Sequence, residues 1–456
     1  MWRRAPVARA AKRMLSTSPV LPPCAHVPEV YAGPPVEEVM RLRRRHFPPA
    51  VTHLYDHPLM LVEGRGQYVF DEQGRRYLDA FAGIVTVHLG HAHPGVCHAV
   101  ADQVARLGHT TNLYVHPEVS LYAAELASKL PAPLEVCFLV NSGSEATDLA
   151  LALARAHTGS LDIIALRNGY SGLGAGAGSA TGIGSWKTPL PVGAAVHHAA
   201  TPDAYRGIHG SSGAAYAADV ADVIDCSTGG RVAGFIAESI QGVGGVVPLA
   251  PGYLPAVYAT IRAAGGLCIA DEVQTGFGRC GSAYWGFEMH GVTPDIVTMA
   301  KAIGNGYPLA AVCTTQRIAS SFKSKWLSTF GGSPVAAAVG RAVLRAVDEE
   351  GLVERARHLG GTLRERLQAL QAKHSVIGDV RGVGLLQGIE LVSNRATKQP
   401  AAQQTAQVLQ RARELGLLLG RGGRHGNVLR ITPPMCITGE DVDFLCDALD
   451  ISLRDL

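Results

Sequence analysis

Short apolar runs rich in β-branched residues alternate with helical patterns through the middle of this chain. Continuous apolar strands separated by helices are typical of a mostly parallel sheet that is covered on both faces. The chain is therefore predicted to be an α/β protein built around such a sheet. The candidate strands are residues 136–141, 162–167, 233–239, 266–271, 295–300 and 310–315, and the clearest candidate helices are residues 144–158 and 253–266.

The pattern changes after residue 335, where long amphipathic helices flank two shorter strand candidates. At 456 residues the chain is long enough for more than one domain. We expect a large domain and a smaller α+β domain to which both ends of the chain contribute, including a hairpin at residues 66–81. The expected division is a leader and linker (1–35), the N-terminal part of the small domain (36–89), the large domain (90–335) and the C-terminal part of the small domain (336–456).

The composition excludes several kinds of partner. The net charge is only +3, so no nucleic-acid partner is expected, and the basic stretch 420–426 is interpreted as a solvated loop. No run of eighteen apolar residues occurs, so no membrane span is expected. The nine cysteines are scattered without a CxxC pair, which predicts buried thiols and no metal site. The glycine- and alanine-rich stretch 172–184 is predicted to be a mobile loop.

The N-terminus has a composition of its own. Residues 1–19 contain five arginines or lysines and no acidic residue, and proline-rich sequence continues to about residue 35. This composition is typical of a mitochondrial transit peptide, with a chloroplast transit peptide as the alternative address. A disordered basic tail is the other interpretation of the same residues.

The first motif with chemical content is the strand–turn–helix segment around residues 141–146. Backbone N–H groups at the start of a helix favour an anion, and Ser142, Gly143 and Ser144 would form a cradle for a phosphate. The residues from Ser142 to Glu145 also spell an S-x-x-E capping box, which needs no ligand. The two interpretations are compatible with each other.

The second motif places Asp271 and Glu272 at the end of a predicted buried strand, where α/β sheets hold their ligands. A carboxylate there could pair with a protonated ring nitrogen, or it could be a helix cap or a structural ion pair. Gly276, Gly278 and Gly281 nearby spell GxGxxG, but no regular helical pattern follows them. A dinucleotide site is therefore not predicted.

The third motif is Lys301, which follows the next predicted strand in an apolar setting. Its stem could be buried with the amine in solvent, which is the ordinary arrangement. Burial would instead lower its pKa and make the neutral amine a nucleophile towards an aldehyde. A phosphate cradle, a carboxylate for a pyridinium nitrogen and a reactive amine are together the three groups that pyridoxal phosphate needs.

Several longer motifs resemble one family. "IADEVQTGFGR" and "PDIVTMAKAIGNGYPLAAV" are similar to the signature of the class III, or ω-type, aminotransferases, and "NSGSEA", "TFGGSP" and "VRGVGLLQGIEL" fit as well. The resemblance extends from about Val51 to the C-terminus. It implies a fold-type I pyridoxal-phosphate enzyme with a seven-stranded sheet. It also implies that the protein is a homodimer or a homotetramer.

The resemblance also implies roles for individual residues. Lys301 would bond to the cofactor aldehyde, Asp271 would hold the pyridinium nitrogen, Gln274 would contact the ring hydroxyl and Tyr170 would lie against the ring. Arg430 would bind the substrate carboxylate, with Glu238 beside it and Ile84 near a small apolar space. The phosphate would be bound by Gly143 and Ser144, next to Ser142, and by Thr329 from the partner subunit.

Three positions depart from the family pattern: Ser171, Ser239 and Ser333. The closest likeness, in "GIVTVHLGHAHP", "ESIQGVGGVV" and "LRITPPMCIT", is to members that use alanine and glyoxylate, so we expect a ping-pong transfer from alanine or a related small amino acid to glyoxylate. Enzymes for β-alanine, 4-aminobutyrate or ornithine, and an aminomutase, are the alternatives. A cofactor-free binding protein would require the loss of Lys301 or Asp271, and both residues are present.

Overall fold

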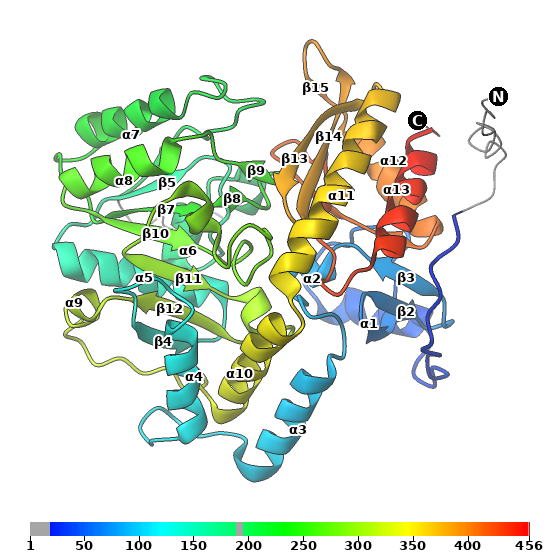
Figure 1. The fold of residues 1–456 in the computed structure, drawn as a ribbon, viewed down its shortest axis with the longest axis horizontal. Coiled ribbons are helices and arrows are strands. Elements are labelled where there is room, and N and C mark those ends of the chain that lie inside the picture. The colour runs from blue at the N-terminus through cyan, green and yellow to red at the C-terminus, as the bar shows by residue number, and fades with distance from the viewer. Residues whose placement is uncertain (1–18, 188–194, 455) are drawn as a thin grey trace, which may run out of the picture.

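The computed structural model describes residues 19–187, 195–454 and 456, which form a larger and a smaller lobe (Figure 1). The larger lobe is built on a seven-stranded sheet of order β4-β12-β11-β10-β7-β5-β6. β12 runs antiparallel to both of its neighbours, and the other pairs are parallel. The predicted α/β fold class is confirmed. The strands are β4 (Val136–Val140), β5 (Ile163–Leu166), β6 (Val196–Ala199), β7 (Gly234–Glu238), β10 (Leu267–Asp271), β11 (Ile296–Met299) and β12 (Ala310–Thr314).

Helices cover both faces of this sheet, as the apolar strands predicted. On β10, Ile269 packs in a cluster with α5 (Gly143–Thr158), whereas Cys268 packs on the opposite face with α7 (Gly213–Ser227) and α8 (Tyr253–Ala263). Nearer to β12 that second face is covered by α4 (Pro117–Ala127) and α10 (Pro334–Glu349). Each strand therefore buries alternate side chains in different cores, which explains why the strand sequences are apolar throughout.

The smaller lobe combines both ends of the chain. Its five-stranded sheet contains β13 (Ile377–Val383), β14 (Leu386–Asn394), β15 (Gln399–Pro400), β17 (Gly420–Gly422) and β18 (Val428–Ile431). Its four-stranded sheet contains β1 (Leu61–Arg65), β2 (Tyr68–Asp71), β3 (Arg76–Asp79) and β16 (Leu417–Leu418), so that a C-terminal strand pairs with the expected N-terminal hairpin.

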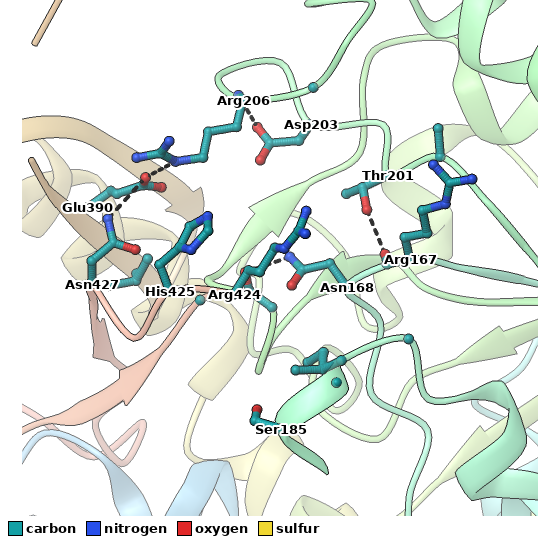
Figure 2. Close-up of a pocket in the computed structure, with 18 of the residues that line it drawn as sticks. Arg167, Asn168, Ser185, Thr201, Asp203, Arg206, Glu390, Arg424, His425 and Asn427 are labelled. Carbon is teal, nitrogen blue, oxygen red and sulfur yellow. Dashed lines mark hydrogen bonds and ion pairs between the residues drawn. The ribbon is translucent and has the colours of Figure 1, made fainter. Parts of the chain in front are cut away.

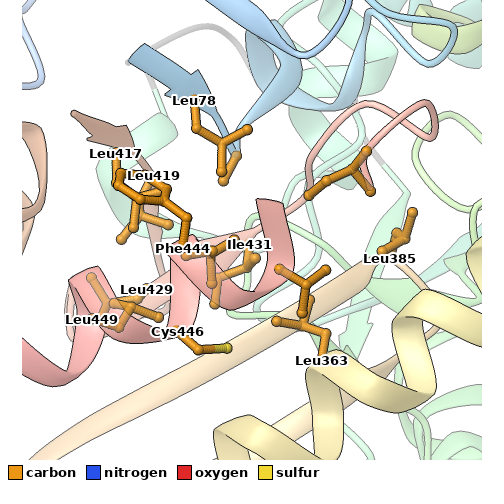
Figure 3. Packing of buried hydrophobic residues seen from close by; sticks show 14 of the residues in the cluster. Leu78, Leu363, Leu385, Leu417, Leu419, Leu429, Ile431, Phe444, Cys446 and Leu449 are labelled. Carbon is orange, nitrogen blue, oxygen red and sulfur yellow. The ribbon is translucent and has the colours of Figure 1, made fainter. Parts of the chain in front are cut away.

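Three long helices of the C-terminal region complete the smaller lobe: α11 (Leu352–Lys373), α12 (Ala402–Glu414) and α13 (Gly439–Arg454). Leucine side chains from these helices and from both sheets meet in one buried core (Figure 3). Leu78 of β3 lies in the same core as Leu429 of β18 and Phe444 of α13. This shared core ties the two ends of the chain into one unit.

Two local predictions differ from the structure. The stretch 172–184 is not a loop throughout, because Ala175–Ala180 form the short helix α6, whose inner face is buried and whose Ala177 N–H donates to Asp148 Oδ1 at 2.7 Å. Strand β6 was not predicted, because its four residues include two histidines and lie at the edge of the sheet.

The predicted transit peptide falls almost entirely on residues outside the described part, and residues 19–35 contain no helix or strand. Within the described ranges, no helix combines the length and the apolar character needed to cross a membrane.

Candidate active site

Three neighbouring parallel strands, β7, β10 and β11, carry the chemical groups at their carboxyl ends. Asp271, the last residue of β10, lies in register with Glu238, the last residue of β7, and with Thr298 of β11. Lys301 begins a short 3-10 turn two residues after β11 ends. These three strand ends bring Glu238, Asp271 and Lys301 to one cavity of about 420 Å³.

Lys301 is held where its amine is easily deprotonated. Its side chain is enclosed by the cavity walls, and this burial lowers its pKa to about 8. The nearby Arg430 guanidinium acts in the same direction, whereas the carboxylates of Asp271 and Glu238 oppose it. A substantial fraction of the amine is therefore neutral near physiological pH, which is the form that attacks an aldehyde.

The two carboxylates of the cavity are both buried. Burial raises the pKa of Asp271 and of Glu238, and the charge of Asp271 raises that of Glu238 further. Asp271 Oδ1 accepts a hydrogen bond of 3.1 Å from the N–H of Val273. A cation placed against Asp271 would lower its pKa again, so this carboxylate is suited to stabilise a positive charge that enters the cavity.

Glu272 has a different role from Asp271. Its two carboxylate oxygens accept hydrogen bonds from the Ser239 and Thr275 hydroxyls and from the N–H groups of Gly286 and Phe287. Donors of the protein thereby occupy the hydrogen-bonding positions of both carboxylate oxygens. The structural interpretation of a carboxylate at this strand end therefore applies to Glu272, and Ser239, one of the departures from the family pattern, is one of its donors.

The start of helix α5 forms one end of the cavity. Ser142 is the N-cap, and its hydroxyl accepts from the N–H of Glu145 at 3.2 Å, while Glu145 Oε2 accepts from the N–H of Asn141 at 2.9 Å. Ser142 therefore caps the helix as predicted, but the capping box is incomplete, because Glu145 accepts from Asn141 and not from the N–H of Ser142 itself. Gly143 and Ser144 line the same cavity, and a Cβ atom at Gly143 would lie 3.4 Å from the Val273 side chain. Capping and an open helix N-terminus occur together here, as the sequence allowed.

Tyr170 and Ser171 form a further side of the cavity. The N–H of Tyr170 donates to Glu238 Oε1 at 3.1 Å, and its ring packs edge-on against Trp186 with 5.3 Å between centroids. Ser171, the second departure from the family pattern, donates its N–H to the Thr181 hydroxyl at 3.0 Å. The main chain at Tyr170 therefore fixes the Glu238 carboxylate, and Ser171 anchors the segment to the end of α6.

Arg430 reaches this site from β18 of the smaller lobe. Its Nη2 donates to Gln274 Oε1 at 2.6 Å, and Gln274 Nε2 donates to Glu238 Oε2 at 3.4 Å. Gln274 thus lies between Glu238 and Arg430, and the two charged groups have no direct ion pair among the described residues. Arg430 is buried, and its Nε has no hydrogen-bond partner in the described chain. Its guanidinium is consequently available to an incoming anion.

Three predicted site residues are not among the residues that line the cavity: Ile84, Thr329 and Arg430, which contacts it through Gln274. Ile84 is half-exposed in a segment with positive φ angles, and Thr329 is exposed. Ser333, the third departure, caps α10 through the N–H of Ala336. Thr86 and Tyr307 line the cavity but were not predicted. Both lie within a few residues of predicted positions, and that proximity was the only signal for them.

Comparisons with known proteins agree with this geometry. Residues 50–453 match the family model described as Aminotransferase class-III. The chain is 50% identical to alanine–glyoxylate aminotransferase 2 homolog 2, mitochondrial, of Arabidopsis thaliana, over 100% of this chain and 97% of that protein. It is 42% identical to alanine–glyoxylate aminotransferase 2, mitochondrial, of Homo sapiens, over 97% and 91%.

A solved structure is similar in fold as well as in sequence. A phospholyase from Arthrobacter, solved in complex with phosphoethanolamine, superimposes with a TM-score of 0.85 and 36% identity, over 92% of this chain and 100% of that one. The family model, the full-length relatives and this fold all agree with a site in which Lys301 and Asp271 line the cavity and Arg430 contacts the lining residue Gln274. The chain belongs to the class III aminotransferase family.

Proposed function

We propose that this enzyme transfers the amino group of alanine to glyoxylate, and that it does so in mitochondria. The full-length relatives named for this reaction, and named mitochondrial, are the observation that carries the proposal. The cavity supports it, because Arg430 offers one buried guanidinium for the single carboxylate that alanine and glyoxylate each carry. Arg430 donates to Gln274 of the cavity lining, and no other arginine of the described residues hydrogen-bonds to that lining, so a second carboxylate would have no comparable partner.

The family uses pyridoxal phosphate, and the residues of the cavity fit it. Lys301 supplies the amine for its aldehyde, and Asp271 supplies the carboxylate for its ring nitrogen. The open N-terminus of α5 at Gly143 and Ser144 supplies donors for its phosphate. Gln274 would contact the ring hydroxyl, and Tyr170 would lie against the ring. When bound, the cofactor supplies a conjugated electron sink for the carbanion that forms at the substrate carbon.

Side chains of the protein would bind the substrate, transfer the proton and balance the charges of the site. Arg430 binds and orients the substrate carboxylate, and Lys301 Nζ removes the proton from the α-carbon of the amino donor. The lowered pKa of Lys301 suits this role, because a pKa of about 8 leaves a substantial fraction of the amine neutral near the working pH. Asp271 keeps a negative charge at the strand end, and Glu238 is fixed by Tyr170 and Gly242 so that it balances Arg430 through Gln274.

The reaction is tested by steady-state kinetics with a panel of substrates. Alanine and β-alanine serve as donors, and glyoxylate, pyruvate and 2-oxoglutarate serve as acceptors. We expect alanine with glyoxylate to give the highest kcat/KM and the parallel lines of a ping-pong mechanism. If 2-oxoglutarate gives the highest kcat/KM, the proposal is wrong and a 4-aminobutyrate or ornithine type of enzyme is the better assignment.

Replacing Arg430 by glutamine tests the carboxylate anchor. We expect kcat/KM for alanine to fall by about 100-fold or more, because a charge-assisted, two-pronged contact is lost. Propan-2-amine, which has no carboxylate, should lose far less. Arg421→Gln, on the neighbouring strand β17 and exposed, is the matched control and should behave as the wild type. An equal loss for both amines would show that Arg430 acts only on the structure of the site.

A phospholyase is the second candidate, because the chain shares fold and sequence with one that binds phosphoethanolamine. Such an enzyme would use the same lysine and would release inorganic phosphate without a keto-acid acceptor. Incubation with phosphoethanolamine alone, followed by a phosphate assay, separates the two reactions. We expect no release above the rate without enzyme.

The proposed assembly is a homodimer or homotetramer in which Thr329 completes the partner's phosphate site. Thr329 is exposed and lies outside its own cavity, next to the exposed Phe330. Exposed apolar side chains also occur at Leu113, Tyr114 and Val115. Apolar patches of this kind are typical of protein interfaces. A residue that is needed for the site but lies outside it can act only if another subunit brings it there.

Mixed dimers test this arrangement. Thr329→Ala should weaken cofactor binding by about tenfold, because one hydrogen bond to a charged phosphate is lost. A hybrid of a Thr329→Ala subunit with an inactive Lys301→Ala subunit contains one complete site only if Thr329 acts across the interface. Co-refolding the two variants should therefore restore cofactor affinity in half of the sites of the hybrid. No restoration would place Thr329 in its own subunit's site or outside both.

A further inference from the structure

A second cavity, of about 610 Å³, lies away from the lysine site and shares none of its lining residues. One side is formed by large-lobe segments that follow β5 and β6, including Arg167 and Arg206. The other side is formed by β13, β14 and the turn between β17 and β18, including Arg424 and His425 (Figure 2). The cavity therefore lies where the two lobes meet.

The buried charges of this cavity are already neutralised by one another. The Glu390 carboxylate is buried and pairs with the Arg206 guanidinium and, at 2.7 Å, with Arg381. Arg381 also pairs with Asp379 at 2.9 Å. Asp203 Oδ1 accepts from main-chain N–H groups of the turn that follows it. Asp203 is the exception, because no arginine or lysine of the described residues forms an ion pair with its carboxylate, so one acidic group of the lining keeps an unpaired charge.

Further cations are nevertheless present. The guanidinium groups of Arg167 and Arg424 make no hydrogen bond or ion pair with another described residue, and neither does the His425 ring. In Figure 2, Arg206, His425 and Arg424 follow one another across the cavity. Burial lowers the pKa of His425, and the charges of Arg206 and Arg424 lower it further, against the opposing charge of Glu390.

We propose that this cavity is a binding site for a small aliphatic anion that carries two or more negative charges, held between Arg167 of the large lobe and Arg424 of the small one. Unpaired guanidinium groups bind phosphate and carboxylate oxygens with charge-assisted bonds. The volume is within the range of small-ligand sites. Among the described lining residues, His425 has the one aromatic ring, and no phenylalanine, tyrosine or tryptophan is present to favour an aromatic ligand.

The site is distinct from the proposed phosphate cradle of the cofactor, and a ligand in it would connect the two lobes. Arg381 of the small lobe donates to the main chain of Gly245 in the large lobe at 2.9 Å, and the N–H of Gly423 in the small lobe donates to the main chain of Val243 in the large lobe at 2.9 Å. The cavity floor therefore already joins the large lobe to the small one by neutral and charged contacts. An anion bound between Arg167 and Arg424 would add further contacts between the two lobes.

The test is calorimetric titration of the cofactor-loaded enzyme with inorganic pyrophosphate, and separately with citrate, at constant ionic strength. Loading with pyridoxal phosphate keeps the lysine cavity occupied. We expect saturable binding of one probe or both with one site per chain. Arg167→Ser combined with Arg424→Ser should weaken that binding by at least about tenfold, because two charge-assisted contacts are lost. Preference for pyrophosphate or citrate identifies phosphate or carboxylate chemistry.

The matched control removes two arginines elsewhere. Arg44 and Arg45 are exposed on α1 (Val36–His46), and their double change to serine alters the net charge by the same amount. This control should bind the probes as the wild type does. Both double variants replace exposed side chains, so their thermal unfolding without probe should match that of the wild type. Absence of saturable binding, equal affinity in the cavity variant, or equal loss in both variants would overturn the proposal.

Discussion

Lys301→Ala should lower the turnover number by about four orders of magnitude or more, since both the covalent bond to the cofactor and the proton-transferring base are lost. The cofactor should still bind through the other groups of the cavity, with the absorption spectrum of the free aldehyde. The measurement is kcat for alanine and glyoxylate together with the visible spectrum. Lys373→Ala, at an exposed ion pair on α11, is the matched control and should leave both unchanged.

An added amine separates a chemical role of Lys301 from a structural one. Methylamine enters a cavity that lacks the lysine side chain and offers a base in the same position, so it should restore part of the proton-transfer rate in the variant. It should have no effect on the wild type. Near-normal turnover of Lys301→Ala without any added amine would remove the proposed mechanism altogether.

The second large effect is expected at Asp271. Replacement by asparagine keeps the shape but removes the negative charge that faces the cavity, and kcat should fall by about 10²- to 10³-fold, as for the loss of one electrostatic group aimed at developing charge. Cofactor affinity should fall as well. Both are measured by titrating the apoenzyme with pyridoxal phosphate and following the rate with alanine.

Glu272→Gln is the control for this charge, because it changes the neighbouring residue by the same chemical step. Glu272 accepts from four donors within the protein, so an amide there would leave at least one N–H donor unpaired, and we expect a loss of about 1–3 kcal/mol in the free energy of unfolding. The rate per folded molecule should change little. If Asp271→Asn retains full transamination while Glu272→Gln does not, the roles of the two carboxylates are reversed.

Much of the site could be predicted because its residues follow directly from strands. Asp271 and Lys301 come at or just after apolar runs that the sequence marks clearly, and parallel neighbours bring their carboxyl ends to one edge. The start of α5 was equally predictable, since a capping serine and a glycine mark the turn. The sequence does not distinguish the roles of the neighbouring residues Asp271 and Glu272. The role of Glu272 depends on hydrogen-bond donors as distant in the chain as Ser239 and Phe287.

Residues on irregular segments were harder to predict. Ile84 and Thr86 lie two positions apart, yet only Thr86 lines the cavity, because positive φ angles at Ile84 and Val85 turn the chain in a way that apolar patterning does not encode. The contact of Arg430 with Gln274 joins β18 to the loop after β10, and no local pattern predicts so distant a pair. The same holds for the second cavity, whose arginines come from both lobes.

If this enzyme carries an amino group from one substrate to the other, each half-reaction can be observed without the second substrate. The cofactor-loaded enzyme is mixed with excess alanine and no acceptor, and absorption and pyruvate are followed in a single turnover. We expect the visible band to disappear as one equivalent of pyruvate forms per site, and we expect glyoxylate then to restore the band and to yield one equivalent of glycine. A visible band that does not change when alanine is added would contradict amino-group transfer. So would the formation of pyruvate without the formation of glycine once glyoxylate is added.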